Sequence, residues 1–380
     1  MLVYLKPSKF LHFLAMNRLQ ACFFLRMIPG LGNVSAKKLW EFSPSPQAIF
    51  DRSPEYFLKL EGTGTNLIGH LKNWKNFADT VYQEEENLQK NQIKTLFLGD
   101  HDYPKTLAFC PDAPLVLFYK GNFNLSQRKL ISIVGRRSGD SKGEKICREL
   151  VAGLQGLDPI IVSGFARGID IIAHDQALKS RLTTLACMAH GLNQIYPPEH
   201  IDFVDKIEAE GGFVSEFTTG EKFDRKHFLI RNRIIAGLSH ATVVIQSKAK
   251  GGSMITANFA HQYNRELFAY PGDLENPLHQ GSHQLIRSQK AQLITGAEDL
   301  IKAMGWESKS IGTAVQKQLF IQLNEEEKII FDCLKLVANE SLDNIAIATG
   351  FSVSKMATVL LKLEMKDCVK PLPGKFFEWA

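Results

Sequence analysis

The chain has 380 residues, of which 44% are hydrophobic and 22% are charged, with a formal net charge of +5. This ordinary globular composition excludes a disordered, collagen-like or low-complexity chain, and the length predicts two or three domains. Apolar runs such as 115–119 and 241–245 have the length of strands. A membrane-spanning helix needs about 20 such residues, so we exclude an integral membrane protein and expect no membrane partner.

Six cysteines are scattered along the chain, without a Cys-x-x-Cys pair or an accompanying histidine cluster. This spacing is typical of reduced thiols in a cytoplasmic protein and predicts no metal site. The first fifteen residues lack the long hydrophobic region and the small-residue cleavage site of a secretory signal. Met1 and Met16 are therefore alternative starts, and we favour Met16.

Residues 16–98 have helical character. Between Ile28 and Leu39, Gly30 and Gly32 allow a tight turn before a helix that we expect to begin near Asn33, with Ala36 and Leu39 on its apolar face. The pattern is similar to SAM or helix-hairpin-helix modules, and in the latter the turn amides hold a DNA phosphate. Because a single hairpin is a weak signal for DNA binding, we favour the other interpretation, in which this is a turn between two helices that holds no ligand.

Residues 99–303 alternate short strands with helical segments, which specifies a parallel sheet with helices on both faces. Ligands of such sheets bind beyond the carboxyl ends of the strands, so the loops after the strands are candidate sites. The expected strands are 130–134, 160–163, 183–188, 212–215, 241–245 and 266–269. The expected helices are 143–154, 169–179, 199–210, 228–238 and 255–263.

Two of these loops combine glycines with arginines at the start of a helix, a composition that suits phosphate. Neither matches G-x-G-x-x-G or the G-K-[ST] of a P-loop, which disfavours a dinucleotide coenzyme or a nucleotide triphosphatase, and we expect no cofactor. The first loop offers Gly135, Arg136 and Arg137, and the second offers Ser163, Gly164, Arg167 and Gly168.

Asp170 and His174 follow the second loop and share a helix face through their i, i+4 spacing. One interpretation is an acid–base pair. We favour the other, in which Asp170 caps loop amides and His174 forms a local hydrogen bond. No second carboxylate, serine nucleophile or metal-ligand set completes a reaction centre, so we predict no catalytic residues.

Residues 221–290 hold ten basic and five acidic side chains, a net +5 that equals the excess of the whole chain. Bases interleaved with aromatic rings are typical of single-stranded nucleic-acid binding, in which cations hold phosphates and rings stack on unpaired bases. The candidates for stacking are Phe223 and Phe228, with a core position as the alternative. The candidate cations, with a glycine-serine loop for phosphate, are Arg225, Lys226, Arg231, Arg233, Lys248, Lys250, Gly252 and Ser253.

A polar linker at 304–323 leads to a third block at 324–380, in which we expect three helices and a terminal β-hairpin, the winged-helix arrangement. Asn324 should cap the first helix, ahead of Glu325, Glu326 and Glu327. Seven lysines and nine acids give this block a net charge of −2. A winged helix that reads duplex DNA is usually basic, so we expect a protein contact or weak DNA binding.

These loops, in this order, resemble the DprA/Smf family of DNA-processing proteins over roughly residues 20–300 and, more loosely, over the winged helix. The segments that carry the resemblance are 99–104, 134–137, 163–170, 173–174, 195–197, 215–216, 231–239, 253–257, 271–272 and 285–287. The sequences SGFARGID and RNRIIAGLS are the most specific. Arg136, Gln246, Gly251 and Asn193 depart from the family's usual residues, and the changes at Gln246 and Asn193 remove negative charge.

The resemblance implies an extended Rossmann-like core that binds single-stranded DNA, protects incoming DNA in natural transformation and loads the recombinase RecA. It also implies a homodimer. The matched DNA-contacting positions are Arg137, Arg225, Lys226, Phe228, Gly252 and Ser253.

Two alternatives remain. The related phosphoribohydrolase enzymes, sometimes labelled lysine decarboxylases, resemble a Pro-Gly-Gly-x-Gly-Thr-x-x-Glu pattern in which the Glu acts chemically. Residues 250–258 here have Lys in place of the Pro and no such Glu. The second alternative, a transcription factor led by the winged helix, conflicts with the acidic charge of that block.

Overall fold

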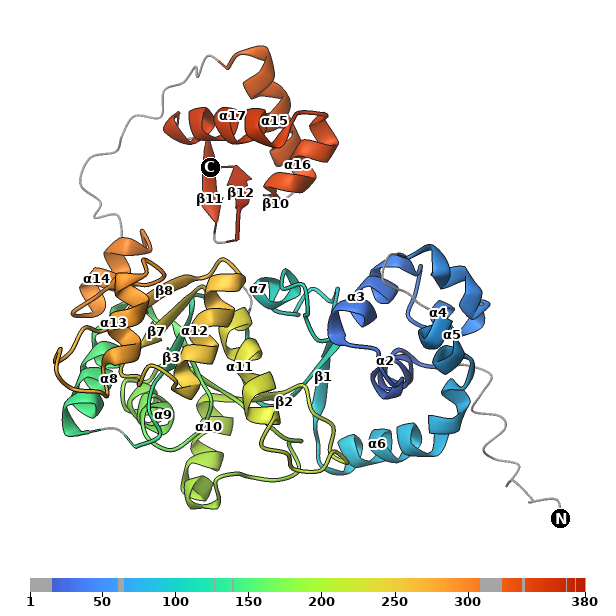
Figure 1. Ribbon diagram of the computed structural model, residues 1–380, viewed down its shortest axis with the longest axis horizontal. Helices are drawn as coiled ribbons and strands as arrows, with labels where there is room; N and C mark the ends of the chain where they lie inside the picture. Colours follow the sequence, from blue (N-terminus) through green and yellow to red (C-terminus); the bar gives the residue numbers. More distant parts are fainter. Residues whose placement is uncertain are drawn as a thin grey trace.

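Figure 1 shows a computed structural model of the chain, with an N-terminal helical domain, a central α/β domain and a small C-terminal domain. The structure describes residues 16–60, 65–125, 128–138, 140–307, 323–336, 339–366, 368–372 and 374–379. Residues 1–15, on which the choice between Met1 and Met16 depends, lie outside this description, as do residues 308–322 of the expected linker.

The N-terminal domain confirms the predicted helical hairpin. Asn17 begins the first helix with a capping box, in which its side chain accepts from the Gln20 amide and the Gln20 side chain accepts from the Asn17 amide. The second helix begins at Asn33, with Ala36 and Leu39 buried as expected. The elements are α2 (Arg18–Met27), α3 (Asn33–Phe42), α4 (Ala48–Asp51), η2 (Pro54–Lys59), α5 (Thr65–Lys72), η3 (Trp74–Phe77) and α6 (Ala78–Lys90).

The central domain is built on a nine-stranded, mostly parallel sheet with strand order β1-β2-β6-β5-β4-β3-β7-β8-β9. Within the sheet, the neighbours β6, β5, β4, β3, β7, β8 and β9 run parallel to one another. At one edge, β2 pairs antiparallel with β6 and β1 pairs antiparallel with β2. The strands are β1 (Lys94–Phe97), β2 (Val116–Gly121), β3 (Leu130–Val134), β4 (Ile160–Ser163), β5 (Thr184–Cys187), β6 (Gly211–Ser215), β7 (Ala241–Val244), β8 (Glu266–Ala269) and β9 (Gln292–Leu293).

All six predicted strands are confirmed to within one residue at each end, because their apolar runs are buried on both faces. In β3, Ile131 and Ile133 enter the hydrophobic core under α8, α9 and α14. Leu130 and Val134 enter the opposite core, and between them the Ser132 hydroxyl donates to the carbonyl of Ile235 on α11 at 2.7 Å. This alternation places helices on both faces of the sheet, as predicted.

The helices of the central domain also follow the prediction, except that 199–210 divides into a 3-10 turn and a short α-helix. The elements are α7 (Lys105–Ala108), α8 (Ser141–Gly153), η4 (Gln155–Leu157), α9 (Ile169–Lys179), η5 (Pro198–Phe203), α10 (Val204–Glu210), α11 (His227–Leu238), α12 (Gly252–Gln262), α13 (Gln280–Arg287) and α14 (Ala297–Ala303).

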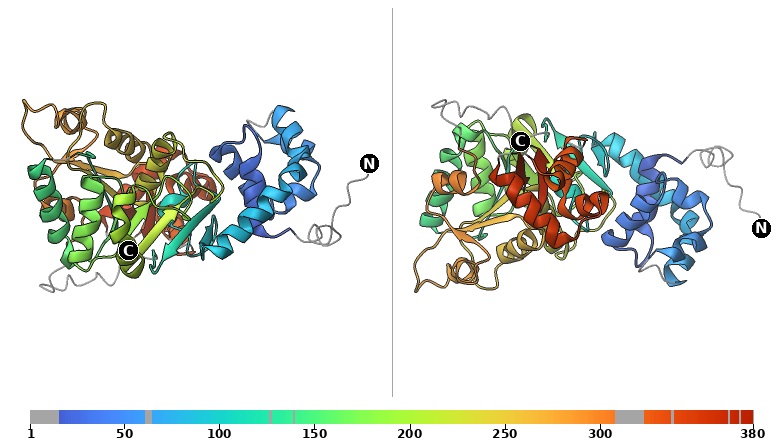
Figure 2. Two further views of the ribbon diagram at one scale, coloured as in Figure 1. Left: turned by 90° about the horizontal axis from the view of Figure 1, so that it is seen from below. Right: turned by 90° about the horizontal axis from the view of Figure 1, so that it is seen from above.

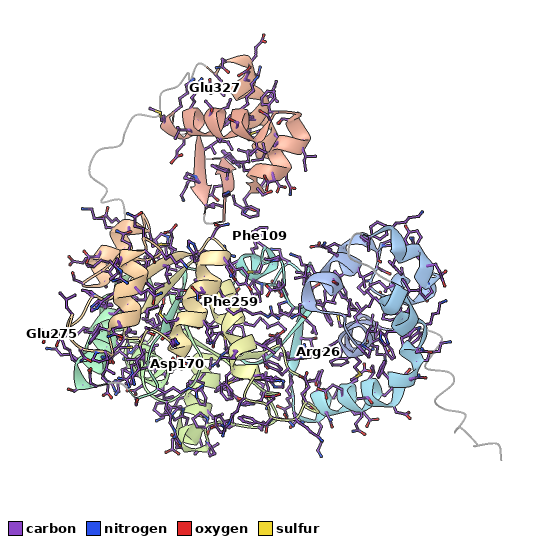
Figure 3. The ribbon with its side chains drawn as sticks, in the orientation of Figure 1. Arg26, Phe109, Asp170, Phe259, Glu275 and Glu327 are labelled. Carbon is purple, nitrogen blue, oxygen red and sulfur yellow. The ribbon has the colours of Figure 1, made fainter. Side chains whose placement is uncertain are left out.

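The N-terminal domain lies beside the sheet edge formed by β1 and β2 (Figures 1 and 2). Glu84 of α6, which is buried, accepts hydrogen bonds from the Thr219 amide and hydroxyl and from the Gly220 amide. Arg26 of α2 points toward the sheet domain (Figure 3) and forms an ion pair of 2.7 Å with Glu221. The buried Glu84 carboxylate and the ion pair between Arg26 and Glu221 therefore join the N-terminal domain to one loop of the central domain, at residues 219–221.

The helical hairpin formed by α2 and α3 faces the central domain. Asn33 donates to the Glu216 carboxylate at 3.3 Å, and the Lys37 ammonium donates to the carbonyls of Ala108 and Cys110 at 2.7 and 3.0 Å. The start of α3 is thus engaged with protein groups, which supports the interpretation as a helix-to-helix turn.

The C-terminal domain has the predicted winged-helix arrangement of three helices and a hairpin, with a short β10 paired to β12 in addition. Asn324 caps the first helix as expected, since its side chain accepts from the Glu327 amide at 2.8 Å. The elements are α15 (Glu325–Leu336), β10 (Glu340–Ser341), α16 (Leu342–Thr349), α17 (Val353–Met365), β11 (Val369–Leu372) and β12 (Phe376–Trp379).

Within the described ranges, no single helix has the length and apolar character needed to cross a membrane, although α16 and α17 meet that measure jointly, across a bend of 107°. In the same ranges, no group of three or more His, Cys, Asp and Glu side chains forms a candidate metal site.

Candidate nucleic-acid interface

A pocket of about 470 Å³ lies at the carboxyl ends of β3 and β7, where the strand order reverses. We call it the switch-point pocket. The loop after β3, the first half of α11 and the loop from β7 into α12 supply most of its wall. Nine residues predicted for the site line it, namely Gly135, Arg136, Arg137, Phe228, Arg231, Lys248, Lys250, Gly252 and Ser253.

Five cationic side chains line the pocket and give it a positive field, and four of them are at least partly exposed. Arg137, Lys248 and Lys250 are exposed, and Arg136 is half-buried with its guanidinium donating to the Ser138 hydroxyl at 3.1 Å. Among the described residues, none of these four forms an ion pair with a carboxylate. Their charge therefore remains available to an anionic ligand.

The N-terminus of α12 adds backbone donors to this field. Gly251 is the N-cap and supplies no side-chain hydrogen bond, so the first amides of α12 are free of a side-chain cap. The Ser253 hydroxyl, which is buried, donates to the Ser247 hydroxyl at 2.8 Å. Gly252 and Ser253 thus offer backbone amides, which is the usual form of a phosphate site at a helix start.

Phe228 lies at the rim of the pocket between cationic groups. Its ring is half-buried, with the Arg137 guanidinium carbon 5.2 Å and the Arg231 guanidinium carbon 5.9 Å from the ring centroid. These distances are those of cation–π contacts. The ring is therefore held in place by its neighbours while part of its surface stays open to a ligand.

Arg231 is a wall residue that organises the pocket. Its side chain is buried and donates to the carbonyls of Gly164 and Cys187, which follow β4 and end β5. Burial lowers the pKa of Arg231, and the neighbouring Asp170 opposes that effect. The adjacent Asn232 donates to the carbonyl of Gly252 at 3.3 Å and so ties α11 to α12.

The second glycine-containing loop mainly supports the first one, and of its residues 163–168 only Ala166 lines the pocket. The Ser163 hydroxyl is buried and donates to the carbonyl of Ile133 at 2.7 Å. Gly168 has a φ of +74°, and a side chain there would collide with the backbone of Arg136 and Arg137. Gly164 likewise has no room for a side chain beside Asp170 and Arg231. The small residues predicted as a phosphate cradle allow this close packing.

Four predicted cations lie outside the pocket wall, and three of them are exposed. Arg167 is exposed and forms a bidentate ion pair with Glu199, with a 2.6 Å contact between Nη2 and Oε2. Arg225 and Lys226 are exposed on the segment that leads into α11, where Lys226 is the N-cap residue. They lie next to Phe228 in sequence, so a ligand that extends beyond the pocket could still reach them.

Arg233 requires a correction, since the structure places it in the interior and away from the pocket. Its guanidinium forms a buried ion pair with Glu216 and donates to the carbonyl of Asp112 at 2.6 Å. Only 4% of Arg233 is exposed. A cation that is enclosed and fully engaged cannot contact a strand in solvent, so we remove Arg233 from the candidate contacts.

Asp170 lies beneath the pocket, within the sheet domain (Figure 3). Burial raises the pKa of Asp170 to about 6, and the nearby Arg231 and a hydrogen bond from the Ala166 amide act against that rise. His174 is buried, pairs through Nδ1 with the Thr184 hydroxyl at 2.6 Å, and has a pKa lowered by burial to about 3. These contacts support the interpretation that Asp170 caps loop amides and His174 bonds locally.

Several residues of the wall lie outside the set predicted for the site. Helical spacing could have found some of them, because Asn232 lies four residues after Phe228 and Thr256 four residues after Gly252, on the same helix faces. The missed wall residues are Val134, Ala166, Asp170, Leu229, Asn232, Ile235, Gly251 and Thr256.

Family models and known proteins of one family match this chain over most of its length. The family described as DNA recombination-mediator protein A matches residues 94–305, and the DprA winged helix domain matches residues 321–375. Protein Smf from Synechocystis sp. is 30% identical over 384 residues, covering 92% of this chain and 96% of the relative. DNA processing protein DprA from Streptococcus pneumoniae is 38% identical over 237 residues, covering 62% of this chain and 83% of the relative.

Solved structures agree with the sequence matches. The X-ray structure of DprA from Streptococcus pneumoniae has a TM-score of 0.57 at 31% identity, and the match covers 72% of this chain and 98% of that one. DNA processing protein A from Helicobacter pylori, whose structure concerns a single-stranded DNA binding mode, has a TM-score of 0.51 at 28% identity, with 57% and 96% covered. With one family match over more than half of its length and a second over its winged helix, this chain belongs to the DprA/Smf family of DNA recombination-mediator proteins.

Proposed function

We propose that this protein binds single-stranded DNA in the switch-point pocket and acts as a recombination mediator. In this role it would protect incoming DNA and load RecA during natural transformation or recombination, as a cytoplasmic homodimer without enzymatic activity. The observation that carries the proposal is the combination of unpaired cations, uncapped helix amides and an accessible ring in one pocket. Cations and amides suit phosphates, and a ring suits an unstacked base.

The chemistry of the pocket favours binding over hydrolysis of a small nucleotide. Among the described residues that line it, Asp170 is the one carboxylate, and it is 8% exposed and engaged with the loop after β4. General acid–base catalysis needs a titrating group within hydrogen-bond reach of the substrate. The Asp170 carboxylate is buried and committed to the loop after β4, which favours binding over the phosphoribohydrolase alternative.

The first test is fluorescence anisotropy with a labelled oligo-dT at two salt concentrations, with duplex DNA and AMP as competitors. We expect tight binding of the single strand that weakens steeply with salt, because each phosphate contact releases counterions. Neither duplex nor AMP should displace the strand efficiently. A flat salt response, or displacement by AMP at low concentration, would contradict the proposal.

Two variants separate the contributions of charge and stacking. Arg137→Ala should weaken binding on all sequences alike and reduce the salt slope by about 1. Phe228→Ala should cost about 1–3 kcal/mol of binding free energy and leave the salt slope unchanged. Arg52→Ala, in the N-terminal domain, is the matched control and should bind like the unaltered chain.

RecA loading and dimerisation need assays of their own. RecA filament formation on strands coated with a single-strand-binding protein should be faster in the presence of this protein. The Arg137→Ala variant should lose that effect in proportion to its loss of DNA binding. Multi-angle light scattering should give twice the mass of the 42.7 kDa chain. A monomeric mass would contradict the homodimer.

A further inference from the structure

Three aromatic rings form a continuous cluster that leads from the switch-point pocket to the surface. The ring centroids of Tyr196 and Phe228 are 5.7 Å apart, those of Phe223 and Phe228 are 5.6 Å apart, and those of Tyr196 and Phe223 are 4.9 Å apart. Each pair lies within the range of favourable aromatic contacts. Phe228 belongs to the pocket, whereas Tyr196 and Phe223 lie beyond its wall.

Tyr196 and Phe223, which we call the aromatic platform, are unusually exposed for rings that contact one another. Each has 44% of its surface accessible. His190, which is buried, lies on the inner side, with its ring centroid 6.4 Å from that of Phe223. The platform is therefore supported from the interior and open on the outside, so its ring faces are accessible to a ligand.

Charged side chains of both signs lie around the platform, because Glu221 and Asp224 line the hollow beside Phe223 and Glu221 is paired with Arg26 at 2.7 Å. Lys222 and Arg225 flank Phe223 in sequence and line the same open hollow, and both are exposed. Arg137 contacts Phe228, the third ring of the cluster. A ligand that covers all three rings thus meets exposed cations at Lys222, Arg225 and Arg137, which suits a polyanion with flat apolar groups.

We propose that the aromatic platform is a second base-stacking subsite for the strand whose phosphates bind in the switch-point pocket. The inference rests on the proposed function and extends it. One unstacked base contacts Phe228 at the rim of the pocket, and a neighbouring base lies against Tyr196 and Phe223. Stacking does not depend on base identity, because every base has a π face.

The test uses the full chain and labelled dT20, with Tyr196→Leu and Phe223→Leu to remove the ring faces while keeping an apolar side chain. We expect each variant to weaken binding by about 5- to 100-fold. The slope of log affinity against log salt should stay unchanged, because no phosphate contact is lost. Tyr196→Phe should bind like the unaltered chain. Phe42→Leu is the matched control, since Phe42 is 40% exposed but packs on Tyr56 and Phe57 in the N-terminal domain.

A second readout does not depend on substitution. A strand that carries 5-iodo-deoxyuridine should form photo-crosslinks to Tyr196 or Phe223, and peptide mapping would locate them. Wild-type affinity in both leucine variants, or crosslinks confined to other residues, would overturn the platform while leaving the pocket in place. Failure of the unaltered chain to bind dT20 would instead overturn the proposed function and the platform with it.

Discussion

The reassignment of Arg233 from the DNA site to the interior gives a sharp prediction. Arg233 and Glu216 are 4% and 2% exposed, and their ion pair is enclosed between α11 and the end of β6. If Arg233 is changed to Met, Glu216 keeps one donor among the described residues, the Asn33 side-chain amide at 3.3 Å, and its Oε1 has no hydrogen-bond partner among them even in the unaltered protein. The variant therefore leaves a buried carboxylate without its counter-charge.

Breaking a buried ion pair from one side costs about 3–5 kcal/mol, whereas replacing both partners with apolar groups is often nearly neutral. We expect Arg233→Met to lower the free energy of unfolding of the central domain by that amount, and Glu216→Leu to lower it by less, because Arg233 keeps the Asp112 carboxylate at 3.7 Å. The double variant should be destabilised by much less than the sum of the two. The cycle measures the interaction between the two side chains, because they are in direct contact.

The assay is urea denaturation followed by circular dichroism, together with dT20 binding measured where each variant is fully folded. We expect the folded Arg233→Met variant to keep the affinity and the salt slope of the unaltered chain, unlike Arg137→Ala. Wild-type stability combined with a reduced salt slope in Arg233→Met would refute the reasoning and return Arg233 to the DNA site.

Three further predictions concern the supports of the pocket and the domain contact. Gly168→Ala should lower the free energy of unfolding by about 1–3 kcal/mol or more, because Gly168 has a positive φ and an added Cβ would collide with the Arg136 backbone. Calorimetry would measure the fall in melting temperature. Glu84→Gln should lose part of its three hydrogen bonds to Thr219 and Gly220 and cost about 1–3 kcal/mol. Limited proteolysis should then cut between the N-terminal and central domains faster than in the unaltered chain. Asp170 has its pKa raised to about 6, so the folded state binds more protons than the unfolded state above the ordinary value of 3.8. Its stabilising effect is therefore complete below about pH 4 and is lost as the pH rises through about 6. The stability of the unaltered chain relative to Asp170→Asn should fall over that window by an amount on the order of 3 kcal/mol, and an unchanged difference in urea midpoints would contradict this.

Sequence patterns predicted the central parallel strands well because those strands are buried on both faces. Leu130–Val134 and Ile160–Ser163 are fully buried, and their apolar runs stand out without any knowledge of their neighbours. The edge strands were harder to predict. Lys94–Phe97 is half exposed, and Gln292–Leu293 has two exposed residues, so neither carries a strong periodic signal. The run at 115–119 has the length of a strand, but its antiparallel pairing with β6 depends on residues nearly 100 positions away.

The sequence by itself determined the three-part organisation, the order of strands and helices along the chain, and the loops that carry glycine and positive charge. These features depend on local periodicity and turn chemistry, which neighbouring residues express directly. The tertiary structure decided which cations face solvent. Arg137, Arg167 and Arg233 look equivalent in sequence, yet they contact Phe228, Glu199 and Glu216 respectively. Whether a charge is free, paired or enclosed depends on partners distant in the chain, and only the folded arrangement brings them together.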